Sequence, residues 1–136
     1  MHKQYLTIVP ASDSYLEKII MEIRRFNHVA VIQIPSCFEL GRKTDIDELK
    51  SHCVEIVHDG ISDLIFDMSE IENAPSILLS TIILWHKKMK ELGGKLFVLK
   101  PTDRVAHIFD ITKIDRIVRV FDSEEVALKA MAVVPE

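Results

Sequence analysis

The spacing of apolar residues predicts five strands in the body of the chain. Residues 18–25 alternate roughly between apolar and polar positions, and an apolar run at residues 29–34 follows a turn, so these two segments are predicted to pair as an antiparallel hairpin. Residues 61–66 are apolar nearly throughout, as in a buried parallel strand. Two more strands are predicted at residues 95–99 and 117–121, and residues 5–9 have the pattern of a further short strand in the N-terminal segment.

Apolar residues at helical spacing predict four helices between and after these strands. The first has Thr44 or Asp45 as its N-cap and ends at Gly60, and the second runs from Ser76 to about Leu92. The third begins at residues 101–103, and Asp122 caps the fourth. The residues expected to face the core are Ile46, Leu49, Cys53, Ile56 and Val57 in the first helix and Val126, Ala130 and Met131 in the last.

The order of elements, β-β-α-β-α-β-α-β-α, predicts a single α/β domain. Its sheet is expected to be mixed and mostly parallel, with about five strands, an antiparallel hairpin at one edge and about four helices. Short βαβ connections in such a sheet are right-handed. The domain is expected to span residues 18–131, after an N-terminal extension (residues 1–17) and before a C-terminal tail (residues 132–136).

Composition and charge narrow the classes of function. The 136 residues have a formal net charge of −4, and their basic residues are scattered, so we expect no nucleic-acid partner. The longest apolar stretch, residues 77–85, is far shorter than the about 20 residues that cross a bilayer. Two cysteines, Cys37 and Cys53, are too few for a disulfide framework. We therefore expect a cytoplasmic protein that does not insert into a membrane.

The enzyme-like class that the sequence suggests most is a phospho-receiver domain. Asp67 ends a central strand and Lys100 ends a later one, as the acceptor aspartate and the lysine of a receiver do. A receiver also needs an acidic pair after its first strand to hold magnesium, and only Glu39 lies near that position. We therefore predict that Asp67 caps a turn and that Lys100 is solvated.

The remaining residue patterns predict no catalytic, metal or cofactor site. His52 and His58 are six residues apart, so they face different sides of a helix and do not form a metal site with Cys53. Cys53 belongs to an apolar helical stripe and is expected in the core, whereas Cys37 lies in a loop. The four glycines form no phosphate-binding loop, which gives little support to a nucleotide or small-ligand binder. We expect no enzyme activity, no metal and no cofactor.

Residues 73–80 follow the carboxyl end of the central strand, where open α/β sheets place their functional crevice. Ser76 comes directly after Pro75 as the predicted N-cap of the long helix, so its hydroxyl lies among unpaired backbone N–H groups. A phosphate on this hydroxyl gains from the helix dipole but presents nearly two negative charges to a docked partner. The alternative is that Ser76 only caps the helix.

Five segments in order along the chain resemble the STAS domain (sulfate transporter and anti-sigma factor antagonist) family, in particular its free-standing anti-anti-sigma members. They cover about residues 18–131. The segments are residues 29–34 followed by 38–40, then 64–69, 91–99, 108–114 and 120–128.

The resemblance implies a non-catalytic module that binds a protein partner. Members of this family bind an anti-sigma factor that is also a serine kinase, which frees a sigma factor, and phosphorylation of one serine breaks the complex. In the family pattern Asp-Ser-(Ser/Thr)-Gly, Ser76 stands at the phosphoacceptor position, with Pro75 in place of the acid, Ile77 at the third position and Leu78 in place of the glycine. Loss of the acid removes a charge that could help to position the kinase's magnesium. Leu78 is expected to place a side chain where the partner backbone would approach.

The start of the long helix is apolar over most of its circumference, and either residues 78, 82, 85 and 89 or residues 79, 83 and 86 are expected to face the core. The remaining apolar area is covered either by neighbouring elements, including the N-terminal extension, or by a partner. We favour the partner, so we expect residues 74–79 to be open to solvent and to bind it. Two other functions remain open. One is a STAS subunit that docks on an ABC-type lipid or solute transporter, and the other is a scaffold component of a signalling assembly, in which the N-terminal extension supports homo-oligomers. The expected partner-binding residues are Phe38, Glu39, Leu40, Ala74, Pro75, Ser76, Ile77 and Leu79.

Overall fold

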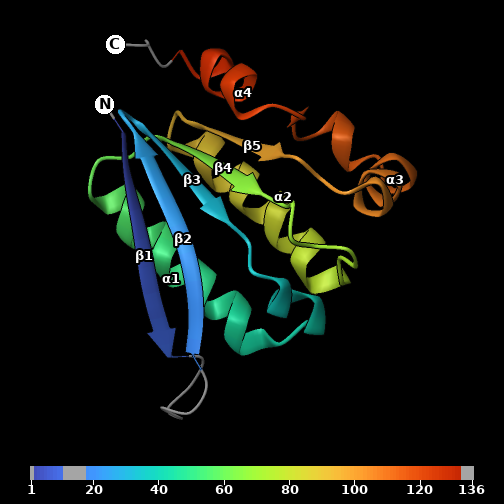
Figure 1. Ribbon diagram of the computed structural model, residues 1–136. Helices are drawn as coiled ribbons and strands as arrows, with labels where there is room; N and C mark the ends of the chain where they lie inside the picture. The colour runs from blue at the N-terminus through green and yellow to red at the C-terminus, as the bar shows by residue number, and fades with distance from the viewer. Residues whose placement is uncertain (1, 11–17, 133–136) are drawn as a thin grey trace.

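The computed structural model describes residues 2–10 and 18–132, with side chains from residue 21 onward, and its centre is one mixed sheet (Figure 1). The strands lie side by side in sequence order, antiparallel from β1 to β3 and parallel from β3 to β6. This arrangement confirms the predicted α/β class and the antiparallel pairing of β2 with β3, but β1, and not this hairpin, forms the edge of the sheet. The strands are β1 (His2–Pro10), β2 (Lys18–Phe26), β3 (Val29–Gln33), β4 (Asp63–Asp67), β5 (Lys95–Leu99) and β6 (Val120–Phe121).

The sheet has six strands, one more than the five predicted for the body of the chain. The additional strand is β1, which contains the predicted short strand at residues 5–9 and pairs with β2 along its whole length, from His2 opposite Phe26 to Pro10 opposite Lys18. Residues 11–17 and 133–136 lie outside the described residues, so the domain limits at residues 18 and 131 remain predictions.

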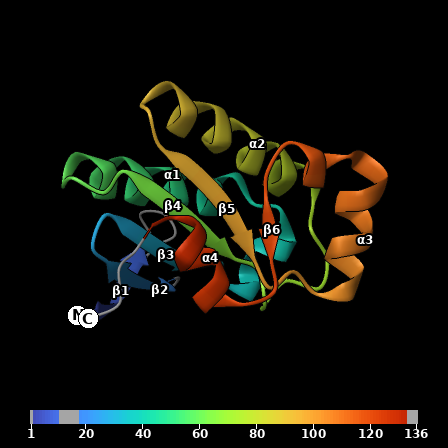
Figure 2. The ribbon, with the colours of Figure 1, turned by 90° about the horizontal axis from the view of Figure 1, so that it is seen from above.

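The helices form a layer on each face of the sheet (Figure 2). α1 (Lys43–His58) and α2 (Ser76–Glu91) cover one face, and the short α4 (Glu124–Ala130) covers part of the other. α3 (Asp103–Thr112) lies beyond the β6 edge of the sheet. The larger core lies under α1 and α2 and includes Phe66, Ile82 and Trp85, whereas the smaller core lies under α4 around Val31 and Phe97.

The start of α1 differs from the prediction. The helix begins at Lys43 with Arg42 as its N-cap, so neither Thr44 nor Asp45 caps it. The carboxylate of Asp45 is instead buried and accepts two hydrogen bonds from the Arg42 guanidinium, at 3.0 Å from Nε and 3.2 Å from Nη2. A buried carboxylate needs such a partner, because its desolvation is costly. The start of α1 at Lys43 thus places Asp45 in the first turn, where it is buried against Arg42.

The last strand and the last helix also differ from the prediction. β6 has only two residues, because the 3-10 helix η2 (Ile114–Arg116) and a helical Ile117 occupy the preceding segment. Ser123, and not Asp122, caps α4, with its Oγ accepting from the Val126 N–H at 3.4 Å. Met131 is buried as predicted, whereas Val126 is half exposed and Ala127 takes the inward position.

Gly94 allows β4 and β5 to approach closely, which gives a test of the fold. A Cβ on Gly94 would lie 1.9 Å from the backbone oxygen of Ser62, so Gly94→Ala should lower the free energy of unfolding by about 3 kcal/mol in urea titrations. Gly93→Ala is the matched control, since its Cβ meets no atom within 4 Å and only its positive φ of +84° is strained, at a cost of about 1 kcal/mol. Equal losses in the two variants would contradict this packing.

Candidate functional site

The carboxyl ends of β3, β4 and β5 bring three connecting segments together at one edge of the sheet (Figure 1). The 3-10 helix η1 (Ser36–Leu40) follows β3, the loop of residues 68–75 joins β4 to α2, and α3 begins shortly after β5. Open α/β sheets commonly bind their ligands at this edge, because the connecting segments converge there. We call η1, Gly41, the loop of residues 68–75 and residues 76–79 the docking surface.

One carboxylate joins η1 to the β4–α2 loop. Oε2 of Glu39 accepts hydrogen bonds from the backbone N–H groups of Glu72, at 2.5 Å, and Asn73, at 3.3 Å. These bonds stabilise the ionised carboxylate, so they are the main reason why the pKa of Glu39 lies below its ordinary value. Glu39 was predicted to bind a partner, and the structure shows its carboxylate bonded within the chain.

The other side of the same loop is tied to the segment that starts α3. The Thr102 hydroxyl donates to the backbone oxygen of Ile71 at 2.8 Å, and Nη1 of Arg104 donates to Oδ1 of Asn73 at 3.0 Å. The Ile71 side chain is fully buried beneath them. The loop that leads into α2 is therefore braced from both sides and from below.

Ser76 is exposed in the first turn of α2, but it does not cap the helix as predicted. Pro75 is the N-cap residue, with φ −69° and ψ 158°, and its carbonyl accepts the first two helical bonds, from Leu78 and Leu79. The N–H groups of Ser76 and Ile77 belong to the unpaired first turn. The Ser76 hydroxyl thus lies next to backbone donors at the positive end of the helix.

Burial within residues 74–79 separates supporting residues from accessible ones. Leu78 is fully buried, whereas Ala74, Pro75, Ile77 and Leu79 are half-buried. The prediction that Leu78 would obstruct a partner is therefore wrong, because this side chain points into the core.

Residues before α1 complete the accessible part of the docking surface. Leu40 is 69% exposed, and a Cβ built on Gly41 would lie 3.4 Å from Pro75 Cβ and 3.8 Å from Ile77 Cγ2. Phe38 is buried, so it supports the surface from below and its side chain is not available to a partner. The accessible apolar residues are thus Leu40 and the half-buried Pro75 and Ile77, and the exposed polar residues include Ser76 and, in the loop, Glu70, Glu72 and Asn73.

Neighbouring elements cover most of the apolar circumference of α2. Leu78, Ile82 and Trp85 are buried in the larger core, and Leu79 and Ile83 pack against it. A partner is therefore not needed to cover the whole helix, and the apolar area that remains near its start is small.

The aspartate, lysine and cysteines that could suggest other chemistry occupy structural or solvated positions. Asp67 caps the turn as predicted, since its Oδ1 accepts from the Ser69 N–H at 2.9 Å, and Lys100 is exposed. Cys53 is buried as predicted, and burial raises the pKa of its thiol. Cys37 is only partly exposed. Among the described residues no cluster of three or more His, Cys, Asp or Glu side chains suits a metal ion.

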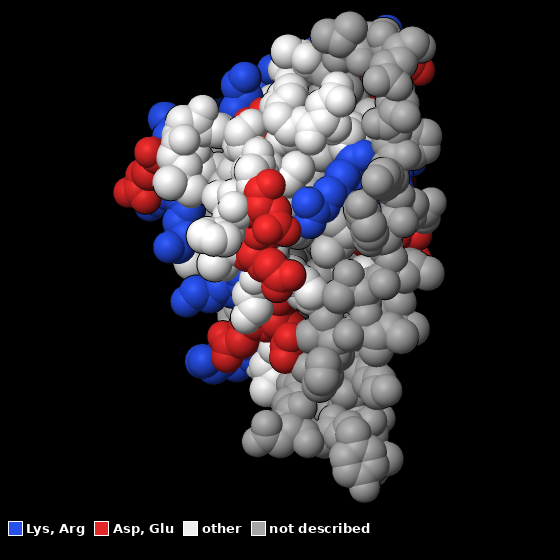
Figure 3. Space-filling view, turned by 90° about the vertical axis from the view of Figure 1, so that its left-hand side faces the viewer, with Lys and Arg blue, Asp and Glu red and all other residues white. Residues whose placement is uncertain are grey.

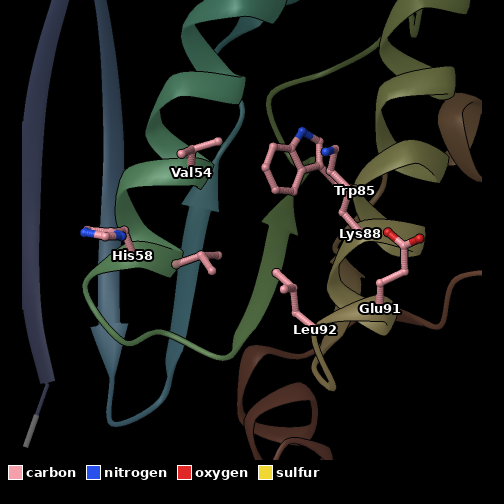
Figure 4. A pocket seen from close by; sticks show the side chains of 7 residues that line it. Val54, His58, Trp85, Lys88, Glu91 and Leu92 are labelled. Carbon is pink, nitrogen blue, oxygen red and sulfur yellow. The ribbon is translucent and has the colours of Figure 1, made fainter.

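A hollow lies between α1 and α2 at their carboxyl ends, away from the docking surface (Figure 4). It has a volume of about 300 Å³, with an apolar lining that includes the exposed Val54 and Leu92 and the buried Trp85. Lys88 lies over the Trp85 ring, 5.8 Å from its centroid. This hollow is a useful control region, because apolar residues are exposed there at the opposite end of the same helix.

The outer face of α1 has a different character. Acidic side chains form a column over this helix in Figure 3. They are partly neutralised, since Lys43 pairs with Asp47 at 3.0 Å and Arg25 pairs with Asp59, just after the helix, at 3.6 Å. A charged and solvated face of this kind lacks the apolar centre of a stable protein interface.

In the described ranges 2–10 and 18–132, no helix has the length and hydropathy needed to cross a bilayer.

The model of the STAS domain family matches residues 21–127, and the chain belongs to this family. A relative from Thermotoga neapolitana, whose name assigns it provisionally to the anti-sigma factor antagonists, is 29% identical over 75 residues. This match covers 55% of the present chain and 66% of the relative, just under two thirds of its length.

Solved structures of named anti-sigma factor antagonists have the same fold. The crystal structure of a provisionally named antagonist from Thermotoga maritima matches with a TM-score of 0.69 at 18% identity, covering 81% of this chain and 92% of that one. Unphosphorylated SpoIIAA, an anti-sigma factor antagonist, matches with a TM-score of 0.69 at 12% identity, covering 85% of this chain and 99% of that one. At such identities the likeness shows the fold alone.

Some residues that shape the docking surface were not singled out from the sequence. Gly41 lies within it, and Thr102 and Arg104 hold its loop from the α3 side. The position of Thr102 before an acidic first turn is a recognisable N-cap signal, and its Oγ1 does accept from the Val105 N–H. Its second bond, to Ile71 across 31 residues, has no local signal in the sequence.

Replacing Leu78 tests its assignment to the core. Leu78→Ala should lower the free energy of unfolding by about 2–5 kcal/mol, because a fully buried side chain leaves a cavity. Ile77→Ala, one residue earlier and half-buried, should cost less than about 1 kcal/mol. Urea unfolding monitored by circular dichroism measures both values, and a larger loss at Ile77 would show that the helix is rotated from the described position.

Proposed function

We propose that the chain is a non-catalytic regulator that binds an anti-sigma factor through the docking surface and thereby frees a sigma factor in the cytoplasm. The observation that supports this most is the exposed Ser76 in the first turn of α2, beside accessible apolar residues on a braced loop. The family membership and the names of the relatives agree with this function.

Phosphorylation of Ser76 is the proposed switch. A partner kinase forms a bond between the Ser76 oxygen and the γ-phosphorus of ATP, ADP leaves, and the hydroxyl proton is released. The modified side chain carries about −1.5 to −2 charges at pH 7, and the helix start stabilises them. The same charges would face the partner beside Ile77 and Leu40, where desolvating a phosphate against apolar groups opposes docking.

The departures from the family pattern are compatible with docking. Pro75 occupies the N-cap with a φ that suits it, and it packs against the position of Gly41. Leu78 adds to the core and leaves the accessible surface unchanged. The departure that bears on phosphate transfer is the missing acid at position 75, so a kinase that modifies Ser76 must place its metal and nucleotide without this carboxylate.

Ser76 variants test the switch. The probe is a purified ATP-binding anti-sigma factor encoded in the same genome, with binding followed by calorimetry and phosphate transfer by mass spectrometry. Ser76→Ala should bind as the unmodified chain does but accept no phosphate, whereas Ser76→Asp should bind at least about tenfold more weakly.

Ser51→Asp is the charge control, because Ser51 is exposed on α1 outside the docking surface. Equal binding by the Ser76→Asp variant and the unmodified chain would show that Ser76 does not act as a charge-operated switch. Binding of a transporter ATPase or permease in place of every anti-sigma factor would favour the alternative function as a transporter subunit.

Replacing the accessible apolar residues tests the docking surface itself. Leu40→Asp and Ile77→Asp should each weaken binding of the same anti-sigma factor about tenfold or more, because each places a charge at the apolar centre of the interface. Leu92→Asp is the matched control, since Leu92 is 66% exposed at the other end of α2. If Leu92→Asp weakens binding and the other two do not, the partner docks at the carboxyl ends of the helices instead.

A further inference from the structure

The two hydrogen bonds of Glu39 span a long separation in sequence. Glu39 lies 33 residues before Glu72 and 34 before Asn73, yet a single oxygen, Oε2, accepts from both of these consecutive N–H groups. Bonds from backbone N–H groups to an ionised carboxylate are stronger than bonds between neutral groups. They therefore tie η1 to the entry of α2 at one point.

The loop that receives these bonds has few apolar anchors of its own. Glu70, Glu72 and Asn73 are exposed, and between Met68 and Pro75 only Ile71 is a fully buried side chain. Among the hydrogen bonds of the described residues, those of Glu39 are the side-chain bonds that reach this loop from η1, while Thr102 and Arg104 hold it from the α3 side.

Fixing Asn73 also fixes the beginning of α2. Only Ala74 separates Asn73 from Pro75, the N-cap, and the proline ring removes the freedom in φ at that residue. Pro75 and Ile77 then lie against Gly41, which directly follows η1. Release of the Glu39 bonds would let η1 and the α2 start move apart, and Gly41 would no longer be held against Pro75 and Ile77.

We propose that Glu39 is a positioning residue whose carboxylate fixes the loop at Glu72 and Asn73, so that η1 and the start of α2 form one rigid docking surface. This role differs from a direct contact with the partner. Its consequence for binding rests on the proposed function, whereas the clamp itself is a property of the free protein.

The charge of Glu39 makes the clamp dependent on pH. The bonds from the Glu72 N–H and from Asn73 and, to a smaller extent, the positive charge of Arg104 on α3 lower the pKa of Glu39 from its ordinary 4.5. The carboxylate of Glu72 belongs to the same loop, and the nearby Arg42 and Asp45 are paired with each other. The clamp is therefore complete above pH 4.5 and is lost as the pH falls through the lowered pKa of the folded state.

Nuclear magnetic resonance of the free protein tests the clamp directly. The amide proton signals of Glu72 and Asn73 should shift together as the pH falls, with a midpoint below 4.5 that matches the Glu39 carboxyl signal. In Glu39→Gln this shared titration should vanish, because the side chain no longer ionises. Glu70→Gln, which removes an equal charge from the same loop, should leave it unchanged.

Hydrogen exchange and binding complete the test. Exchange of the Glu72 and Asn73 amides should be up to about tenfold faster in Glu39→Ala, and slowed in part by Glu39→Gln, whose amide oxygen still accepts a bond. Binding of the anti-sigma factor should weaken in the same order, while Glu55→Gln, on the exposed face of α1 outside the docking surface, should bind normally.

The possible failures are distinct. Amides of Glu72 and Asn73 that do not titrate with Glu39, or Glu39→Ala binding that equals the unmodified chain, would overturn the positioning role. If the titration is seen but no anti-sigma factor binds even the unmodified chain, the clamp is supported and the proposed function fails.

Discussion

Parallel pairing of β3, β4 and β5 is the constraint on which the docking surface depends. Val29 lies opposite Asp63 and Asp63 opposite Lys95, so the three five-residue strands are in step and end at one edge. The segments that follow them, far apart in sequence, are thereby brought together. The carboxylate, hydroxyl and guanidinium bonds that brace the loop depend on this register, because a shifted strand would displace the segment that follows it.

A network on the other face of the sheet reaches the same loop. Arg24 on β2 pairs with Glu124 of α4 and, at 3.5 Å, with Oδ2 of Asp67. The second oxygen of Asp67 accepts from the Ser69 N–H, where the loop leaves β4. Asp67 is nearly fully buried, so its charge needs these partners. The residue that superficially suggests a phosphoacceptor is thus a structural link between α4, β2 and the docking surface.

The docking surface combines a rigid support with few accessible groups. Leu78 and Phe38 fill the core beneath it, and the polar bonds fix the loop from the side. Ser76 and a small apolar area beside it are left to solvent, next to the exposed loop residues Glu70, Glu72 and Asn73. Such an arrangement suits a reversible switch, because a single added phosphate changes a large share of the accessible chemistry without disturbing the fold.

The sequence by itself determined the α/β class, the order of elements and the place of Ser76 at the start of the long helix, because apolar periodicity and turn residues are local signals. The limits of β5 and the burial of Cys53 also followed from this periodicity. Only the tertiary structure decided that Pro75 caps α2, that Leu78 points inward, that Asp45 is buried against Arg42, and that β6 is short. It also decided that Glu39 bonds across 33 residues. These outcomes depend on which distant groups lie nearby after the sheet has assembled, and no spacing along the chain encodes that proximity.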